Sequence, residues 1–252
     1  MRGTAGASVR TNAARMPRLA VILALAVSLA SVAEATFNLI GLTIDDPITR
    51  DVVERYTLAR NLQPVRFLGT VRTTDWLLDR PHLAAALARH LHPPLERYHI
   101  AMRDDGSFAV NDLGTLRGSL RLVAQGANRR VYFCQGQFRS LAHILQLTGN
   151  MVFALEYRDS RQGADPAVDV TPQLYVRLDN VLAHGLLKII APLVHGVIDR
   201  RVANLTAATQ VVAERISRDP DGLYREMQTW SDIRPEDLEA YRQAFAMERF
   251  IR

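Results

Sequence analysis

The chain has 252 residues and a formal net charge of +5. Residues 1–35 hold four Arg and one Glu, so they carry three of these charges and leave +2 for the 217 residues that follow. A charge this small does not indicate a nucleic-acid partner, and a single cysteine, Cys134, excludes an intramolecular disulfide.

The first 35 residues have the three-part order of a secretory signal peptide. Residues 1–18 are basic, Leu19–Val32 is an apolar run of 14 residues, and Ala33-Glu34-Ala35 supplies the small residues of a cleavage site. The apolar run is shorter than the roughly 20 residues that a membrane-spanning helix needs. We therefore expect residues 1–35 to be cleaved and the protein to be exported, to the periplasm or the extracellular space. Retention as an uncleaved anchor is the alternative.

Proline and capping residues mark the predicted helix starts before the sheet. Asp46 followed by Pro47 predicts a helix over Asp46–Asn61, inside an N-terminal helical extension of residues 36–64. Two short helices are predicted next, over Asp75–Leu78 and Pro81–Leu91.

Between Arg97 and Asp179 the apolar residues recur with period two, which is typical of half-buried strands. Six of the seven predicted strands are consecutive and closely connected, which indicates an antiparallel meander. Asp159–Asp169 is predicted to be a polar loop. The seven predicted strands are Val65–Arg72, Tyr98–Arg103, Ser107–Asn111, Gly114–Gln125, Arg129–Phe138, Met151–Arg158 and Thr171–Asp179.

The connection Arg139–Asn150 is unusually apolar for a link between strands. Its pattern predicts an amphipathic turn or small helix at the rim of the sheet. Leu141, Ile144 and Leu145 would form a gate that admits a ligand and touches a membrane transiently. The alternative is a loop that only caps the core.

A long helix is predicted over Val181–Ser217, and its two halves differ. Val181–Ile198 is apolar on nearly every side, whereas Asp199–Ser217 has one apolar stripe. A helix that is apolar all round must be covered by protein or lipid. A C-terminal helical extension, residues 219–252, follows it. An exposed apolar patch around its Leu223, Tyr224, Met227 and Trp230 would favour an interaction module, whereas packing of this segment on its own domain would count against one.

The order of a strand, two short helices, six strands and a long helix resembles the helix-grip fold of the START-like (SRPBCC) superfamily, the polyketide cyclase and birch-pollen-allergen group. The residue patterns of two segments, TTDWLLDRPHLAAAL and LYVRLDNVLAHGLLKIIAPLV, show the same resemblance, which covers residues 65–218. The resemblance implies an α+β fold in which a seven-stranded curved antiparallel sheet wraps the C-terminal helix, with an apolar cavity between them. The helices added at both ends depart from the minimal pattern.

The resemblance implies a lipid-like or other hydrophobic small molecule as the ligand, without a cofactor. Ordinary core packing is the alternative explanation for the apolar helix. The predicted ligand-binding residues are Leu182, Leu186, Ile189, Ile190, Leu193, Val194, Val197, Phe133, Phe153 and Tyr175.

Two other functions stay open at this point. A cyclase or dehydratase could use His143, His184 or Glu156 for acid–base chemistry in the same cavity. An envelope-associated interaction module would use the terminal extensions instead. No spacing of His, Cys, Asp or Glu resembles a metal site.

Overall fold

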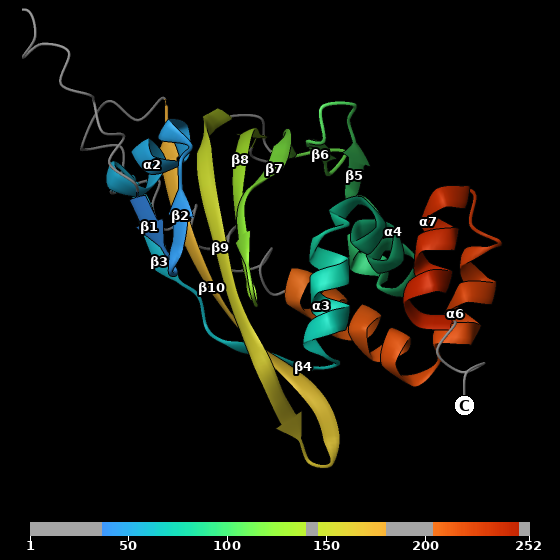
Figure 1. Cartoon of the computed structure of the whole chain (residues 1–252). Coiled ribbons are helices and arrows are strands. Elements are labelled where there is room, and N and C mark those ends of the chain that lie inside the picture. The colour runs from blue at the N-terminus through green and yellow to red at the C-terminus, as the bar shows by residue number, and fades with distance from the viewer. Residues whose placement is uncertain (1–36, 140–145, 180–203, 247–252) are drawn as a thin grey trace, which may run out of the picture. The chain divides into compact units, whose positions relative to one another are not determined.

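The computed structural model describes residues 37–139, 146–179 and 204–246, all within the unit Thr36–Arg252 (Figure 1). Its centre is an eight-stranded antiparallel sheet with the order β3-β10-β9-β8-β7-β6-β5, in which β4 also pairs with β10. The meander predicted from the period-two pattern is present in β5 to β10. The strands are β3 (Leu58–Asn61), β4 (Val65–Leu68), β5 (His99–Met102), β6 (Phe108–Asn111), β7 (Leu116–Gly126), β8 (Arg129–Arg139), β9 (Gln146–Gln162) and β10 (Asp165–Leu178).

The sheet has eight strands rather than seven because β3 occupies the last four residues of the helix predicted over Asp46–Asn61. Helix α2 (Pro47–Glu54) begins as predicted, with Asp46 as its N-cap, but ends seven residues early. The backbone N–H of Thr57 then donates to Val176 O at 2.7 Å and starts the pairing of β3 with β10. This strand depends on a partner more than 100 positions away, so the local pattern could not predict it.

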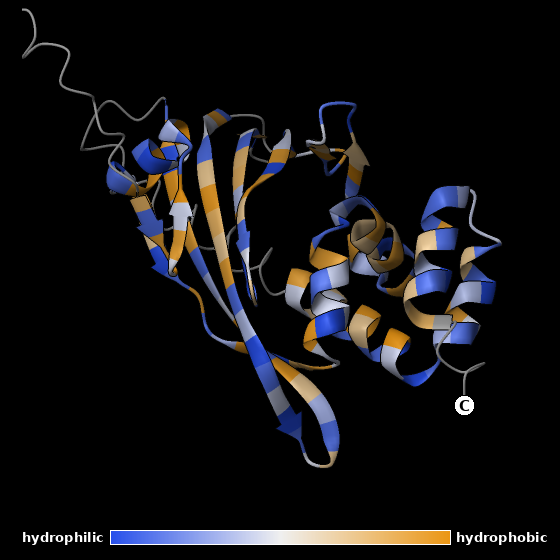
Figure 2. Cartoon of the chain, viewed as in Figure 1, coloured by the Kyte–Doolittle hydropathy of each residue, from blue (hydrophilic) through white to orange (hydrophobic). Residues whose placement is uncertain are grey.

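The predicted loop Asp159–Asp169 is instead the far end of the β9–β10 hairpin, which turns at Gly163 with φ of 65°. Figure 2 shows that this end is mainly polar (blue). Cross-strand ion pairs stabilise it: Asp169 accepts hydrogen bonds from Arg66 of β4 at 2.6 and 2.9 Å. The prediction was wrong because charged residues that pair across strands have the composition of a loop.

Three glycines lie side by side on adjacent strands: Gly118 of β7 pairs with Gly136 of β8, which pairs with Gly149 of β9. A Cβ on Gly118 would lie 2.3 Å from Gln135 O, and one on Gly149 would lie 2.3 Å from Arg177 O. Glycine is therefore required here for the close approach of the backbones.

One face of the sheet, called the hairpin face here, is covered by α2 and by a separate two-stranded hairpin of β1 (Phe37–Leu39) and β2 (Leu42–Ile44). Large side chains meet there and are completely buried. Ile44, Val52, Val131 and Val152 each have 0 % exposure.

The opposite face, called the helix face, is covered by helices on which apolar residues line one side (Figures 1 and 2). Thr70 caps α3 by accepting a hydrogen bond from Thr73 N, so the strand predicted to reach Arg72 ends at Leu68. The helix predicted over Pro81–Leu91 is confirmed as α4. The helices are α3 (Val71–Leu78), α4 (Pro81–Leu91), the short η1 (Pro93–Leu95), a helix over residues 204–218, α6 (Pro220–Met227), α7 (Pro235–Tyr241) and the π-helix η2 (Arg242–Ala246).

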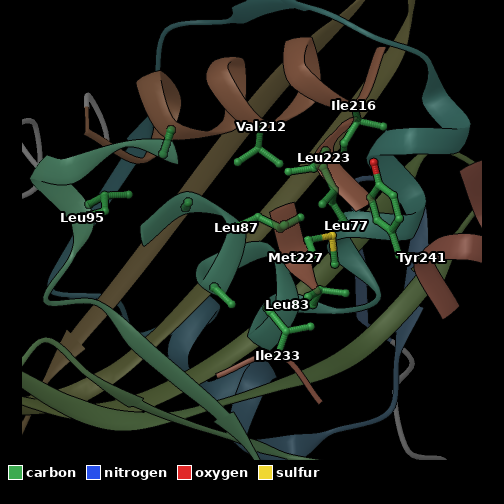
Figure 3. Packing of buried hydrophobic residues seen from close by; sticks show 13 residues of the cluster. Leu77, Leu83, Leu87, Leu95, Val212, Ile216, Leu223, Met227, Ile233 and Tyr241 are labelled. Atoms are coloured by element: carbon green, nitrogen blue, oxygen red, sulfur yellow. The ribbon is translucent and has the colours of Figure 1, made fainter. Parts of the chain in front are cut away.

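The C-terminal extension packs back onto these helices rather than presenting a contact surface. Leu223 and Met227 have 0 % exposure and meet Leu83 and Leu87 of α4 in one cluster with Tyr241 (Figure 3). Leu223 and Met227 therefore belong to the core rather than to an exposed patch, and this packing counts against an interaction module at these residues. Of the long helix predicted over Val181–Ser217, the structure describes only the part from residue 204, which is helical.

Candidate functional site

A cavity of about 330 Å³ lies between the helix face of the sheet and the helices that cover it. The sheet side of its wall is formed by Leu62, Val65, Phe67, Leu120, Tyr132, Phe153, Leu155, Val170 and Pro172. The helix side is formed by Thr74, Leu77, Leu78, Pro81, Ala84, Ala85 and Ala88. The helix over residues 204–218 and the segment from η1 to β5 complete the described wall. They contribute Leu205, Thr206, Ala208, Thr209 and Val212, and Leu95, Tyr98 and Ile100, respectively.

The space exists because α4 presents small side chains to the sheet. Ala84 and Ala88 are four residues apart and Ala85 adjoins them, so all three share one side of the helix. On the other side of α4, Leu83 and Leu87 are fully buried against the C-terminal extension. The large residues of α4 thus anchor the helix, and its alanines leave room at the sheet.

Part of the cavity wall is in contact with water on the helix over residues 204–218, called the C-terminal helix here. Leu205 lines the cavity and yet is 48 % exposed, and Thr209 on the next turn is exposed as well. A large apolar side chain in contact with both water and the cavity is expected at an entrance for an apolar ligand.

The strand register decides which predicted residues reach this cavity. Phe153 pairs with Tyr132 and lines the wall. Phe133 and Tyr175 both pair with Val152, one residue away, and therefore point to the hairpin face. Their placement beside the ligand is corrected accordingly.

Glu156 does not face the cavity either. It is exposed on the surface and accepts a hydrogen bond from Arg129 at 3.2 Å. The remaining predicted site residues lie outside the described residues: the gate residues Leu141, Ile144 and Leu145, the histidines His143 and His184, and Leu182, Leu186, Ile189, Ile190, Leu193, Val194 and Val197.

The sequence analysis missed the contribution of α3 and α4 to the wall. The signal was present in PHLAAALARHL, where alanines at spacing four run beside the leucine row. Such a pattern predicts two different packing surfaces on one helix, but it does not say that one surface borders open space.

A buried polar cluster ties α3 to the sheet next to the cavity. Arg130 is only 6 % exposed; its guanidinium donates to Asp75 at 2.8 Å and to Asp79 at 2.9 Å. It also donates to the carbonyls of Gly126 and Arg129. The hydroxyl of Tyr157 donates to Asp75, and burial together with this bond raises the pKa of Tyr157 well above its ordinary value. Because the donors of Arg130 are matched by acceptors, the cluster acts as a structural clamp.

Titratable groups are scarce along the cavity. Among the described lining residues only Tyr98 and Tyr132 carry one, and burial raises the pKa of Tyr132 above its ordinary value. Cys134 lies on the same sheet face without lining the cavity, and burial raises the pKa of its thiol to about 12. The described wall therefore presents no carboxylate–histidine pair for acid–base chemistry.

Metal and membrane sites can be considered only for the part of the chain that the structure describes. There, no group of three or more His, Cys, Asp or Glu could hold a metal ion. In the same residues we find no helix with the length and hydrophobicity needed to cross a bilayer.

Comparisons with known proteins add little to this geometry. No protein-family model matches the sequence, and no curated protein matches it. A conserved protein from Geobacillus kaustophilus is similar in structure with a TM-score of 0.44 and 11 % identity, covering 63 % of this chain and 97 % of its own. Norcoclaurine synthase from Thalictrum flavum has a TM-score of 0.40 and 14 % identity, covering 75 % of this chain and 97 % of its own. An uncharacterized protein from Rhizobium leguminosarum has a TM-score of 0.39 and 11 % identity, covering 63 % and 97 %.

The fold class of the protein is therefore assigned from its own strands and helices. It is an α+β protein whose large antiparallel sheet and several helices are compatible with a helix-grip arrangement.

Proposed function

We propose that this chain is an exported, non-enzymatic binding protein of the START-like helix-grip type, which holds one lipid-like or other apolar small molecule in its cavity. The observation that carries the proposal is a cavity of about 330 Å³ whose described wall is almost entirely aliphatic and aromatic. Small-molecule sites span roughly 300–1,000 Å³, so this volume suits one small ligand or one chain of a lipid.

Binding would be driven by removal of apolar surface from water, which contributes roughly 25 cal/mol per Å². The alanines of α4 give the ligand room, and Phe153, Leu120 and Val170 of the sheet give it apolar contacts. The exposed Leu205 at the entrance supports a transient contact with a membrane, from which an apolar ligand could enter without crossing water.

Export is proposed on the basic, apolar and small-residue order of residues 1–35. The check is N-terminal sequencing of the protein recovered from the fraction outside the inner membrane. A chain beginning at Thr36 agrees with the proposal, whereas a chain that keeps Leu19–Val32 and stays with the membrane contradicts it.

The binding test is native mass spectrometry of the protein purified without detergent, together with titration of a fluorescent apolar probe such as 1-anilinonaphthalene-8-sulfonate. We expect a co-purified apolar molecule and saturable binding of one probe per chain. Ala85→Phe fills the cavity and should abolish both signals. Ala101→Phe, the same change at an exposed position of β5 outside the wall, should keep them. Equal binding by both variants would show that the ligand is held elsewhere.

A further inference from the structure

Three of the five hydroxyl-bearing residues in the described cavity wall donate their protons to main-chain carbonyls. Tyr132 donates to Leu78 O at 2.8 Å, Thr74 donates to Thr70 O at 3.1 Å, and Thr209 donates to Leu205 O at 2.8 Å. They belong to β8, α3 and the C-terminal helix, so the same arrangement recurs on separate elements.

A hydroxyl has one proton and two lone pairs. Once its proton is used, it can still accept a hydrogen bond, but it can donate a second one only by breaking the first. Tyr132 is 4 % exposed and Thr74 is 5 % exposed, so the carbonyls they serve would lose a partner that water cannot readily replace. The hydroxyls of Tyr132 and Thr74 therefore offer a bound molecule acceptors and no donors.

Two of the three acceptors lie at α3. Thr74 and Leu78 lie four residues apart on one side of α3, and Tyr132 reaches this helix through its bond to Leu78 O. A ligand with a polar end would therefore be matched best when that end points toward α3.

We propose that the cavity selects a neutral apolar molecule whose polar group is a hydrogen-bond donor, such as a long-chain or cyclic alcohol, over ketones, ethers and carboxylates. This inference rests on the proposed binding function. Beside α3, a ligand hydroxyl donates to the lone pairs of Thr74 and Tyr132, whereas an ether oxygen finds no donor on these two side chains. An ionised carboxylate also loses its hydration on burial, so it should bind more weakly than either the alcohol or the ether.

The test is isothermal titration calorimetry, in which the protein comprising residues 36–252 is titrated with octan-1-ol, 1-methoxyoctane and octanoate. The ether is more apolar than the alcohol, so burial alone favours the ether. We expect the alcohol to bind at least as tightly as the ether, and octanoate to bind at least about tenfold more weakly at about pH 8. Octanoate should gain affinity toward about pH 5, where protonation turns it into a neutral donor, while the alcohol should not.

The outcomes separate this inference from the proposed function. If the ether binds more tightly than the alcohol, or octanoate binds as well as the alcohol at about pH 8, the donor selection is wrong while the binding function stands. If none of the three compounds binds and no apolar probe does, the binding function itself is wrong.

Two variants locate the acceptors. Thr74→Val keeps the shape of the side chain and removes its oxygen, and Tyr132→Phe does the same on the sheet. Each substitution should weaken the binding of octan-1-ol severalfold and leave the binding of 1-methoxyoctane unchanged. Thr229→Val, which removes a similar bond to Glu226 O in the C-terminal extension, should change neither. Alcohol binding unaffected by Thr74→Val and by Tyr132→Phe would overturn the placement at α3; if Tyr132→Phe does not fold, Thr74→Val decides alone.

Discussion

The two faces of the sheet are built from alternate residues of the same strands, yet they pack differently. On the hairpin face, Val131 and Val152 meet Ile44 and Val52, and all four are fully buried. On the helix face, Tyr132 and Phe153 and the alanines of α4 line a cavity of about 330 Å³ between the sheet and the helices. The difference teaches that the covering layer, rather than the sheet, determines where a ligand can bind.

The largest expected effect contrasts the removal of a leucine on each face. Leu39→Ala on the hairpin face empties a packed position that is 6 % exposed, and it should lower the free energy of unfolding by about 2–5 kcal/mol. Leu120→Ala on the cavity wall removes a half-buried side chain beside existing space, so it should cost clearly less. Urea unfolding of both variants measures the difference, and equal losses would contradict it.

The opposite change should also distinguish the faces. Ala154→Leu forces extra volume into the hairpin face, where Ala154 has 0 % exposure, and should destabilise the protein by about 1–3 kcal/mol. Ala85→Leu extends into the cavity instead, so its unfolding free energy should stay within about 1 kcal/mol of the parent. A strongly destabilised Ala85→Leu would mean that α4 already lies against the sheet at this point.

Acid should loosen the C-terminal extension from α4. Burial alone would raise the pKa of Asp237, but hydrogen bonds from Arg234 and His82 outweigh it and hold that pKa below its ordinary value. The charged carboxyl therefore stabilises the fold above about pH 4, and this contribution is lost as the pH falls through the lowered pKa. Asp237→Asn should lower the free energy of unfolding by about 1–2 kcal/mol at neutral pH, and by progressively less as the pH falls through the lowered pKa.

Tryptophan fluorescence measures this loosening, because Trp76 and Trp230 both pack against the apolar cluster between α4 and the C-terminal extension. Asp104→Asn, in the exposed turn between β5 and β6, is the control and should leave the fluorescence transition where it is. A variant Asp237→Asn with the parent's acid midpoint would show that the extension is held by apolar contacts alone.

The smallest effect concerns Cys134, on the helix face of β8. Because burial raises its pKa to about 12, very little thiolate exists at neutral pH, and iodoacetamide should react slowly with the folded protein. Reaction should be rapid in urea, where the thiol regains its ordinary pKa. Mass spectrometry of timed samples compares the two rates, and equal rates would place the thiol in water.

Much of the local structure could be predicted from particular residues. Asp46 with Pro47 begins α2, Pro81 begins α4, and the period-two pattern locates β5 to β8 within a few residues. These features depend on capping, on the fixed φ of proline and on side-chain alternation, which all act between near neighbours. Strand β3 could not be predicted in this way because it is stabilised by β10.

The candidate site was harder to predict because it depends on register and on what covers each face. Alternation indicates that Phe133 and Phe153 each point to one of two sides, but only the pairing of Phe133 with Val152 shows that the sides differ. The alanines of α4 are ordinary helix formers, and only the neighbouring sheet makes them the wall of a cavity.

The sequence by itself therefore determined an α+β chain with an antiparallel meander, the starts of α2 and α4, and an apolar segment, Val181–Ile198, that must be covered. Only the tertiary structure decided which residues share a face, that the C-terminal extension covers α4, and that space remains beneath Ala84, Ala85 and Ala88. The physical reason is the distance along the chain over which each interaction acts. Capping and alternation are settled within a few residues, whereas a cavity is the volume left over when elements far apart in the chain pack together.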